Sequence, residues 1–358
     1  MTPPVRPAAR AGLILAGTAA GLLAAEGFLR FHWLTGALPP AGMDSFARAA
    51  QETPEVQIVR HDPLLGWSNA PSRKRGDITI NARGFRAERE YAVPKPAGTF
   101  RAVVAGDSFT FGWDAADRQI YCRRLEDSFG SSGEVVNMGV LGFGVDQMLL
   151  ALERDAPELQ PDVAVMAAII DDFPRIRNSI VVPNGFGKPA FSLAGELLVL
   201  GNVPVPARIE PGRPIVWGEP TAAQKWRAFK TMPWALPELA RRAFAAERPV
   251  PSNPSALEPL PPLYREILRR FRKSARAMGA RPMLMILPRS DEWFAPPYLL
   301  AQIREFCRAE DLPLLDLFPV FERFPRGFFS GHPNAAAHQA IADALGADLR
   351  RRGWGPGH

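Results

Sequence analysis

The feature that most constrains the fold is an alternation of short apolar runs with longer amphipathic segments, which begins near residue 100 and resumes after a proline-rich middle region. The apolar runs have the length of strands, roughly four to eight residues, and the segments between them show the three- and four-residue apolar spacing of helices. The expected strands are residues 100–105, 134–138, 163–170, 282–287 and 313–316, and the expected helices are residues 119–129, 144–159, 263–278, 298–309 and 334–351.

Strands that alternate with helices predict a parallel sheet that is covered by helices on both faces. The run at residues 163–170 contains no polar residue, which is typical of a central strand buried on both sides. We therefore expect an α/β fold, a three-layer α/β/α sandwich with a flavodoxin-like parallel sheet, formed by residues 97–180 and 259–352.

Two segments fall outside this alternation. Residues 35–96 are expected to form a stalk and an N-terminal extension. The stalk, up to about residue 60, lacks strong periodicity, and residues 61–96 are dense in turn-forming residues, with one short strand at residues 78–80. Residues 181–258 are rich in proline, which favours irregular chain, and contain Trp217, Trp226 and Trp234. We expect this second segment to be a Pro/Trp-rich insertion.

The N-terminal residues 1–34 have the pattern of a membrane-targeting segment. Arg6 and Arg10 precede an uncharged stretch, residues 11–25, and apolar residues continue to Leu34. Two interpretations compete, a cleaved signal peptide and an uncleaved transmembrane helix. We favour the helix, a membrane anchor, because no convincing small-residue cleavage site follows the apolar run. Basic residues before the span place the rest of the chain outside the cytoplasm.

The composition excludes several classes of function. The formal net charge is +6, but the arginines are scattered over expected helices, so no nucleic acid is expected as a partner. Cys122 and Cys307 lie in expected helices without metal-ligand spacing, and we expect buried thiols, no metal and no cofactor. The chain has no glycine-rich phosphate loop followed by Lys and Ser or Thr, which disfavours phosphoryl transfer.

Chemically useful residues follow the expected strands, where functional groups gather in open parallel sheets. Ser108 follows the first strand and Gly142 follows the second. Asp171 and Asp172 follow the third, and His332 precedes the last helix. The topology is therefore expected to bring these residues to one edge of one sheet.

Ser108 and His332 fit the roles of nucleophile and base. A serine hydroxyl needs a base within hydrogen-bonding reach and donors for the developing oxyanion. Ser108, between a strand and a helix, can offer its own backbone N–H, and Gly142 can offer a second because glycine allows close approach of the backbone. Asn334 is expected to cap the helix that follows His332. Packing explains His338, which lies well inside that helix, more simply than catalysis does.

Segments around these residues resemble the conserved blocks of the SGNH/GDSL serine hydrolase superfamily. Gly106-Asp107-Ser108 resembles the first block, residues 137–142 resemble the second, with Gly142 at the oxyanion glycine, and residues 331–338 resemble the last. The resemblance implies an SGNH hydrolase fold and carboxylester hydrolysis or acyl transfer.

Three further segments resemble the membrane-anchored bacterial branch of that superfamily, namely residues 61–67, 81–86 and 202–206. This part of the resemblance implies a single-pass protein of the bacterial inner membrane, with the catalytic domain outside the cytoplasm. The partners that it implies are the membrane and an acylated small molecule or glycan.

The third block departs from the family pattern. The family has an asparagine there that donates to the oxyanion, whereas this chain has Asp171, which can donate only when it is protonated. The apolar residues before Asp171 could keep it protonated by desolvation. On this hypothesis Asp171 completes an oxyanion hole with Ser108 and Gly142.

The last block departs as well. The family's acid that orients the histidine lies two or three residues before it, where this chain has Ser330 and Phe329. The sequence leaves several orienting or supporting groups open. They are Asp107, Asp172, Asp316, Glu322, Ser330 and a backbone carbonyl.

The function expected from these residues is that of a serine esterase, deacetylase or O-acyltransferase with a Ser108–His332 site. Its substrate would be an acylated glycan or lipid, and release to water or to a sugar hydroxyl would decide between hydrolysis and transfer. The alternative is a catalytically weakened module on the same fold that binds a glycan or an envelope partner, which the two altered positions would explain.

Overall fold

The computed structural model describes residues 17–18, 20–28, 58–177, 180–181, 186–205, 257–289, 297–322 and 329–357. Its centre is a five-stranded parallel sheet in the order β13-β12-β7-β5-β6. The strands are β5 (Phe100–Gly106), β6 (Gly133–Asn137), β7 (Val163–Ile169), β12 (Arg281–Leu287) and β13 (Leu314–Asp316). Within this sheet, the first strand in chain order, β5, lies between the second, β6, and the third, β7, so the expected flavodoxin-like order is confirmed.

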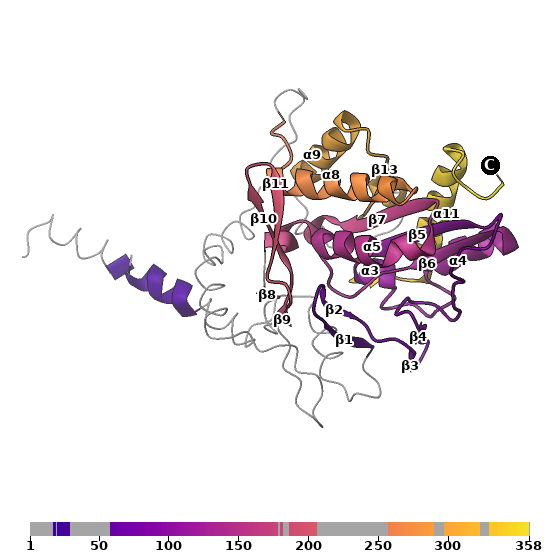
Figure 1. The fold of residues 1–358 in the computed structure, drawn as a ribbon. Coiled ribbons are helices and arrows are strands. Elements are labelled where there is room, and N and C mark those ends of the chain that lie inside the picture. The colour runs from indigo at the N-terminus through magenta and orange to yellow at the C-terminus, as the bar shows by residue number, and fades with distance from the viewer. Residues whose placement is uncertain are drawn as a thin grey trace, which may run out of the picture.

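Helices cover both faces of the sheet, as expected (Figure 1). One face carries α5 (Val145–Leu159), α8 (Pro262–Ala277) and α9 (Pro297–Ala309), and the other carries α4 (Tyr121–Phe129) and α11 (Ala335–Arg351). Residues of β7 alternate between the two cores, with Met166 in the first and Val165 in the second. All seven residues of β7 are buried, which is why the strand has no polar residue.

The expected strands and helices of the sandwich are confirmed, with their ends shifted by one or two residues. The sequence prediction lacks the one-turn helices α3 (Ser108–Phe111) and α10 (Phe318–Phe321). Both are four residues long, too short to show a helical period.

The N-terminal extension forms two hairpins, β1 (Val59–Asp62) with β2 (Gly66–Asn69) and β3 (Arg73–Arg75) with β4 (Ile78–Ile80). The strand expected at residues 78–80 is β4. Asp62 accepts the N–H groups of Leu64 and Leu65 and pairs with Arg154 of α5 at 2.6 Å. The described part of the extension is therefore fastened to the sandwich.

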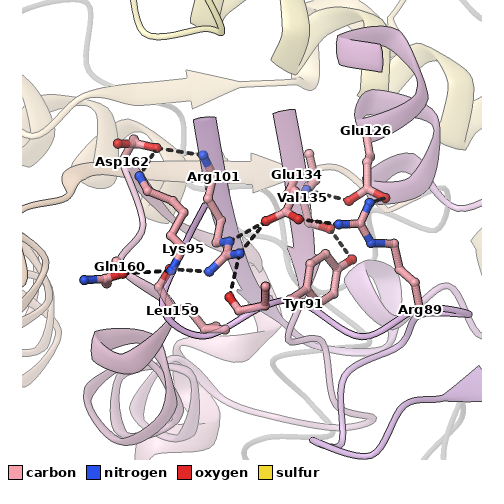
Figure 2. Close-up of polar contacts among 11 residues, drawn as sticks. Arg89, Tyr91, Lys95, Arg101, Glu126, Glu134, Val135, Leu159, Gln160 and Asp162 are labelled. Carbon is pink, nitrogen blue, oxygen red and sulfur yellow. Dashed lines mark hydrogen bonds and ion pairs between the residues drawn. The ribbon is translucent and has the colours of Figure 1, made fainter. Parts of the chain in front are cut away.

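A buried charge network fastens the end of the extension to the amino ends of β5 and β6 (Figure 2). The fully buried guanidinium of Arg101 donates to Glu134 from Nε at 2.6 Å, to the Leu159 carbonyl at 2.6 Å and to the Ala92 carbonyl at 2.9 Å. The Tyr91 hydroxyl donates to the carbonyl of Val135 at 3.0 Å. The extension thus supplies hydrogen-bond partners for buried polar groups at the amino edge of the sheet.

The described part of the insertion consists of short β-structure that the sequence prediction lacks. It comprises β8 (Ile180–Val181), β9 (Phe186–Gly187) and the hairpin of β10 (Ala190–Ala194) with β11 (Leu197–Gly201). Lys188 is buried and pairs with buried Asp146 at the start of α5. Residues 206–256, including the three tryptophans named above, lie outside the described residues.

The expected membrane anchor falls largely outside the described residues. Residues 17–18 and 20–28 are helical, with Leu22, Leu23 and Phe28 exposed. Within the described parts of the chain, none of the helices has the length and apolar character needed to span a membrane.

Candidate active site

Ser108 is placed by a sharp connection between β5 and the one-turn helix α3. Asp107 caps this helix, because its Oδ1 accepts the N–H of Phe109 at 2.9 Å. The helix ends at Gly112, whose φ of 77° is in the left-handed region that favours glycine. Ser108 is the first residue of α3, and the first N–H groups of a helix have no partner within the helix. Its backbone N–H can therefore donate to a ligand.

His332 comes from the other end of the chain to the same place. Its Nε2 lies 2.9 Å from Oγ of Ser108, a hydrogen-bonding distance. The residue belongs to β15 (His332–Pro333), which pairs with β14 (Phe329–Ser330). Asn334 caps α11, as expected, by accepting the N–H of Ala337 at 3.0 Å. The hydroxyl and imidazole named from the sequence thus lie side by side.

The acid beside the imidazole is Asp114, which the sequence analysis does not name. Its Oδ2 lies 3.2 Å from Nδ1 of His332, on the side of the ring opposite to Ser108. The side chain of Asp114 is 44% exposed and that of His332 is 18% exposed. A carboxylate at this distance holds the imidazole in the orientation and tautomer that point Nε2 at the hydroxyl.

The candidates expected for this orienting role have other contacts. Asp107 caps α3, and Asp172 accepts the N–H of Ile169 at 3.0 Å and pairs with Arg175. Asp316 accepts the N–H of Phe318 and pairs with Arg304.

The backbone of Ser330 pairs with that of His332 in the short β14–β15 ladder. The carboxylate that lies against His332 is therefore Asp114, which is not among the groups that the sequence leaves open, because its distance in the chain from His332 hides the pairing.

Asp107 and Asp172 form a buried acidic pair behind Ser108. Burial raises the pKa of Asp107, and it raises the pKa of Asp172 well above the usual carboxyl range, with the neighbouring Asp107 adding to the second shift. Arg175 opposes both shifts, since Nη1 pairs with Asp172 and lies 3.6 Å from Oδ2 of Asp107. The same nitrogen donates to the carbonyl of Phe143 at 2.8 Å. This arginine therefore ties the two acids to the loop that follows β6.

The loop after β6 presents Gly142 near the carboxyl end of the sheet. Gly142 has a φ of 73°, a conformation that favours glycine. Gly139 is needed for space, because a Cβ there would lie 2.4 Å from the backbone nitrogen of Phe111. Two side chains of the extension hold the loop, since Trp67 donates to the Leu141 carbonyl at 2.8 Å and Asn69 to the Gly139 carbonyl at 3.0 Å.

Asp171, the residue expected to complete the oxyanion hole, forms an ion pair with Arg289. Oδ2 of Asp171 contacts Nη1 of Arg289, and the two side chains are 20% and 21% exposed. In this contact the carboxyl group accepts the guanidinium N–H. The apolar strand before Asp171 does not exclude a cation, because the partner comes from the loop after the neighbouring strand.

His338 is a packed core residue, as expected. It is fully buried, and its Nδ1 accepts the N–H of Tyr121 at 3.3 Å. Burial lowers the pKa of His338 to about 3, with the charge of Arg124 as the next cause. Cys122 and Cys307 are both buried free thiols, also as expected. Among the described residues, no group of His, Cys, Asp and Glu is arranged to hold a metal ion.

The arrangement is that of a nucleophile, a base and an orienting acid in hydrogen-bonding sequence. Asp114 was missed because it lies six residues after Ser108 in a turn that no periodic pattern marks. The sequence does contain one signal, a carboxylate two residues after Gly112, the glycine that ends α3. That glycine turns the chain back toward the start of the helix.

Comparisons with known proteins give only distant structural similarities. No family model and no curated protein matches the chain. The fold is similar to a member of the lipolytic protein G-D-S-L family from Veillonella parvula, with 12% identity and a TM-score of 0.41 over 71% of this chain and 100% of that one. At this degree of similarity, the likeness alone says nothing about what the chain binds or catalyses.

Two further solved structures have comparable similarity. The psychrotrophic esterase EstA from Pseudoalteromonas sp. has 11% identity and a TM-score of 0.39, over 70% of this chain and 97% of that one. The lipase Lip_vut3 from a goat rumen metagenome has 13% identity and a TM-score of 0.39, over 72% and 99%.

Proposed function

We propose that this protein is a serine ester hydrolase or O-acyltransferase in which Ser108 is the nucleophile, His332 the base and Asp114 the acid that orients it. The observation that carries the proposal is the hydrogen-bonded series of Ser108 Oγ, His332 Nε2 at 2.9 Å, and His332 Nδ1 with Asp114 Oδ2 at 3.2 Å. Nucleophile, base and orienting group in such an order are what serine catalysis requires.

In acylation, Oγ of Ser108 forms a bond to the ester carbonyl carbon while its proton moves to Nε2 of His332. The electron pair of the carbonyl moves onto the oxygen, to which the backbone N–H groups of Ser108 and Gly142 donate. The tetrahedral intermediate then reforms the carbonyl and breaks the bond to the alcohol oxygen. This oxygen takes the proton from Nε2 and leaves as an alcohol.

In deacylation, a water molecule or a second hydroxyl group adds to the acyl carbon and gives its proton to Nε2. Collapse of the second intermediate breaks the bond to Oγ of Ser108, which takes that proton back. Asp114 stabilises the imidazolium that forms in both halves. Water as acceptor gives hydrolysis, and a sugar hydroxyl gives acyl transfer.

The substrate class that we propose is an acylated glycan or lipid outside the cytoplasm, reached by a domain anchored in the bacterial inner membrane. This rests on the sequence resemblance and on the apolar stretch after Arg6 and Arg10.

The first test compares the hydrolysis of p-nitrophenyl acetate by the wild type and by Ser108→Ala. Removing the nucleophile is expected to lower kcat by at least about 10⁴-fold, because removal of a catalytic serine has cost roughly 10⁶-fold elsewhere. Ser128→Ala is the matched control, since Ser128 is an exposed serine on α4 whose hydroxyl bonds to the Leu125 carbonyl. Equal rates for wild type and Ser108→Ala would remove the catalytic role of Ser108.

A fluorophosphonate probe provides a second, covalent test. The wild type is expected to gain the mass of one phosphonyl group on the peptide that contains Ser108, and His332→Ala is expected to label far more slowly. An unlabelled wild type that binds acylated glycans would support the alternative of a binding module.

A further inference from the structure

Asp171 and Arg289 occupy matching positions at the carboxyl edge of the sheet. The last residues of β7 and β12, Ile169 and Leu287, are paired in register. Asp171 and Arg289 each lie two residues beyond that pair, and their side chains form an ion pair. The contact is therefore fixed by the register of two central strands.

The pair follows strands at the same edge of the sheet as the candidate nucleophile. β7 separates β12 from β5, and Gly106 of β5 pairs with Ala167 of β7, so Ser108 and Asp171 follow adjacent strands. Burial raises the pKa of Asp107, the neighbour of Ser108, and the charges of His332 and Arg289 both act to lower it. The guanidinium is thus electrostatically coupled to the same carboxyl group as the imidazole.

The two side chains differ in whether they can donate or accept hydrogen bonds. A carboxylate offers only acceptors, whereas a guanidinium is permanently charged and offers several N–H donors. The side chain of Arg289 is 21% exposed, so part of it is open to solvent at this edge.

We propose that Arg289 donates to the oxyanion and that Asp171 is the positioning residue that aims its guanidinium. This inference rests on the proposed function, because it concerns the same tetrahedral intermediate. The Asp171–Arg289 pair then takes the part that a neutral amide donor would play beside the N–H groups of Ser108 and Gly142. A preorganised cation at a developing negative charge stabilises the transition state more than the neutral ester.

The test is a double-mutant cycle with p-nitrophenyl acetate, a neutral ester that carries no charge for Arg289 to bind. Arg289→Gln is expected to lower kcat by about 10²–10³-fold with little change in KM, since one oxyanion donor is lost. Asp171→Asn introduces an amide that can donate directly. In the Asp171→Asn background, Arg289→Gln is therefore expected to lower kcat by less than about tenfold.

An equal loss of kcat from Arg289→Gln in both backgrounds, or no loss in either, would overturn the inference. Arg289→Lys, which keeps a charged donor, is expected to retain more activity than Arg289→Gln and tests the role if the glutamine variant is unstable. Arg269→Gln is the matched control, because Arg269, an exposed residue of α8, pairs with Glu266 of the same helix and with Glu310, which follows α9. Thermal unfolding of every variant separates loss of folding from loss of the donor.

Fluorophosphonate labelling distinguishes this inference from the proposed function. Absence of labelling at Ser108 in the wild type would remove the proposed function itself. Labelling of the wild type at Ser108, with the same labelling and hydrolysis rates for Arg289→Gln, would remove only the role of Arg289.

Discussion

The two ends of the central sheet use the same kinds of charged side chains under different conditions. At the amino end, Arg101 is fully buried, and its guanidinium donates to Glu134 and to two backbone carbonyls (Figure 2). At the carboxyl end, Arg289 and Asp171 remain about one-fifth exposed, and Asp114 is 44% exposed. Buried polar groups with hydrogen-bond partners stabilise the fold, whereas similar groups that are partly exposed are accessible to a substrate.

The largest effect is expected from removing the Arg101 guanidinium at the amino end of the sheet. Arg101→Met should lower the free energy of unfolding by about 3–5 kcal/mol, because it leaves the Leu159 and Ala92 carbonyls and part of the Glu134 carboxylate without a donor in a buried site. Urea denaturation measures this change. The activity of the remaining folded protein should stay close to that of the wild type.

Lys95→Met is the control for that experiment. Lys95 pairs with Asp162 in the same network, but the two side chains are 17% and 39% exposed. Its loss should cost less than about 1 kcal/mol. Equal destabilisation by Lys95→Met and Arg101→Met would show that burial does not distinguish the two pairs.

The next effect concerns the carboxyl end. Asp114→Asn should lower kcat/KM for p-nitrophenyl acetate by about 10²–10³-fold, which is less than the roughly 10⁴-fold loss in triads with a buried acid, because solvent screens a half-exposed carboxylate. The free energy of unfolding should change by no more than about 0.5 kcal/mol. Steady-state kinetics and urea denaturation on the same samples separate the two effects.

Asp127→Asn is the matched change, because Asp127 is also an exposed aspartate, paired with Arg123 on α4. It should leave kcat/KM unchanged. If Asp114→Asn also leaves kcat/KM unchanged, the acid next to His332 has no part in the reaction.

The smallest expected effect concerns His338, a second histidine in the C-terminal segment that contains His332. It compares a buried imidazole with the partly exposed one at the site. His338 has its pKa lowered by burial to about 3 from a usual value of 6.5. Below pH 6.5 the unfolded chain therefore binds a proton that the folded protein does not bind, so His338 makes stability fall as pH falls toward about 3. At pH 5 this contribution amounts to about 2 kcal/mol.

His338→Gln should remove that contribution. Urea denaturation at pH 7 and pH 5 is expected to show a smaller loss of stability for the variant than for the wild type. Parallel losses in the two proteins would mean that His338 is protonated in the folded state as readily as in the unfolded chain.

The sequence predicts the sandwich well because each of its strands is a local apolar run. β7, for example, is buried along its whole length and needs no information from elsewhere in the chain. The hairpins of the extension are different, because distant groups fix them. Trp67 is held by the Leu141 carbonyl and Asp62 by Arg154, and no local pattern reveals such partners.

The site was predictable in part for the same reason. Ser108 begins α3 after β5, Gly142 lies in the loop after β6 and His332 lies shortly before α11, and topology brings these residues to one edge. Asp114 and Arg289 are placed by side-chain contacts with distant parts of the chain, Asp114 with His332 and Arg289 with Asp171. Their pairing depends on register and turn geometry, which composition and periodicity do not encode.

The long sequence separation between Ser108 and His332 provides a way to follow the folding of the protein. Ser108 and Asp114 share one short segment, but the imidazole is 224 residues away along the chain from the hydroxyl. If the proposed function holds, ester turnover begins only when the C-terminal segment has docked against the start of the sandwich. Hydrolysis of a chromogenic ester during refolding from urea would then report the completion of folding.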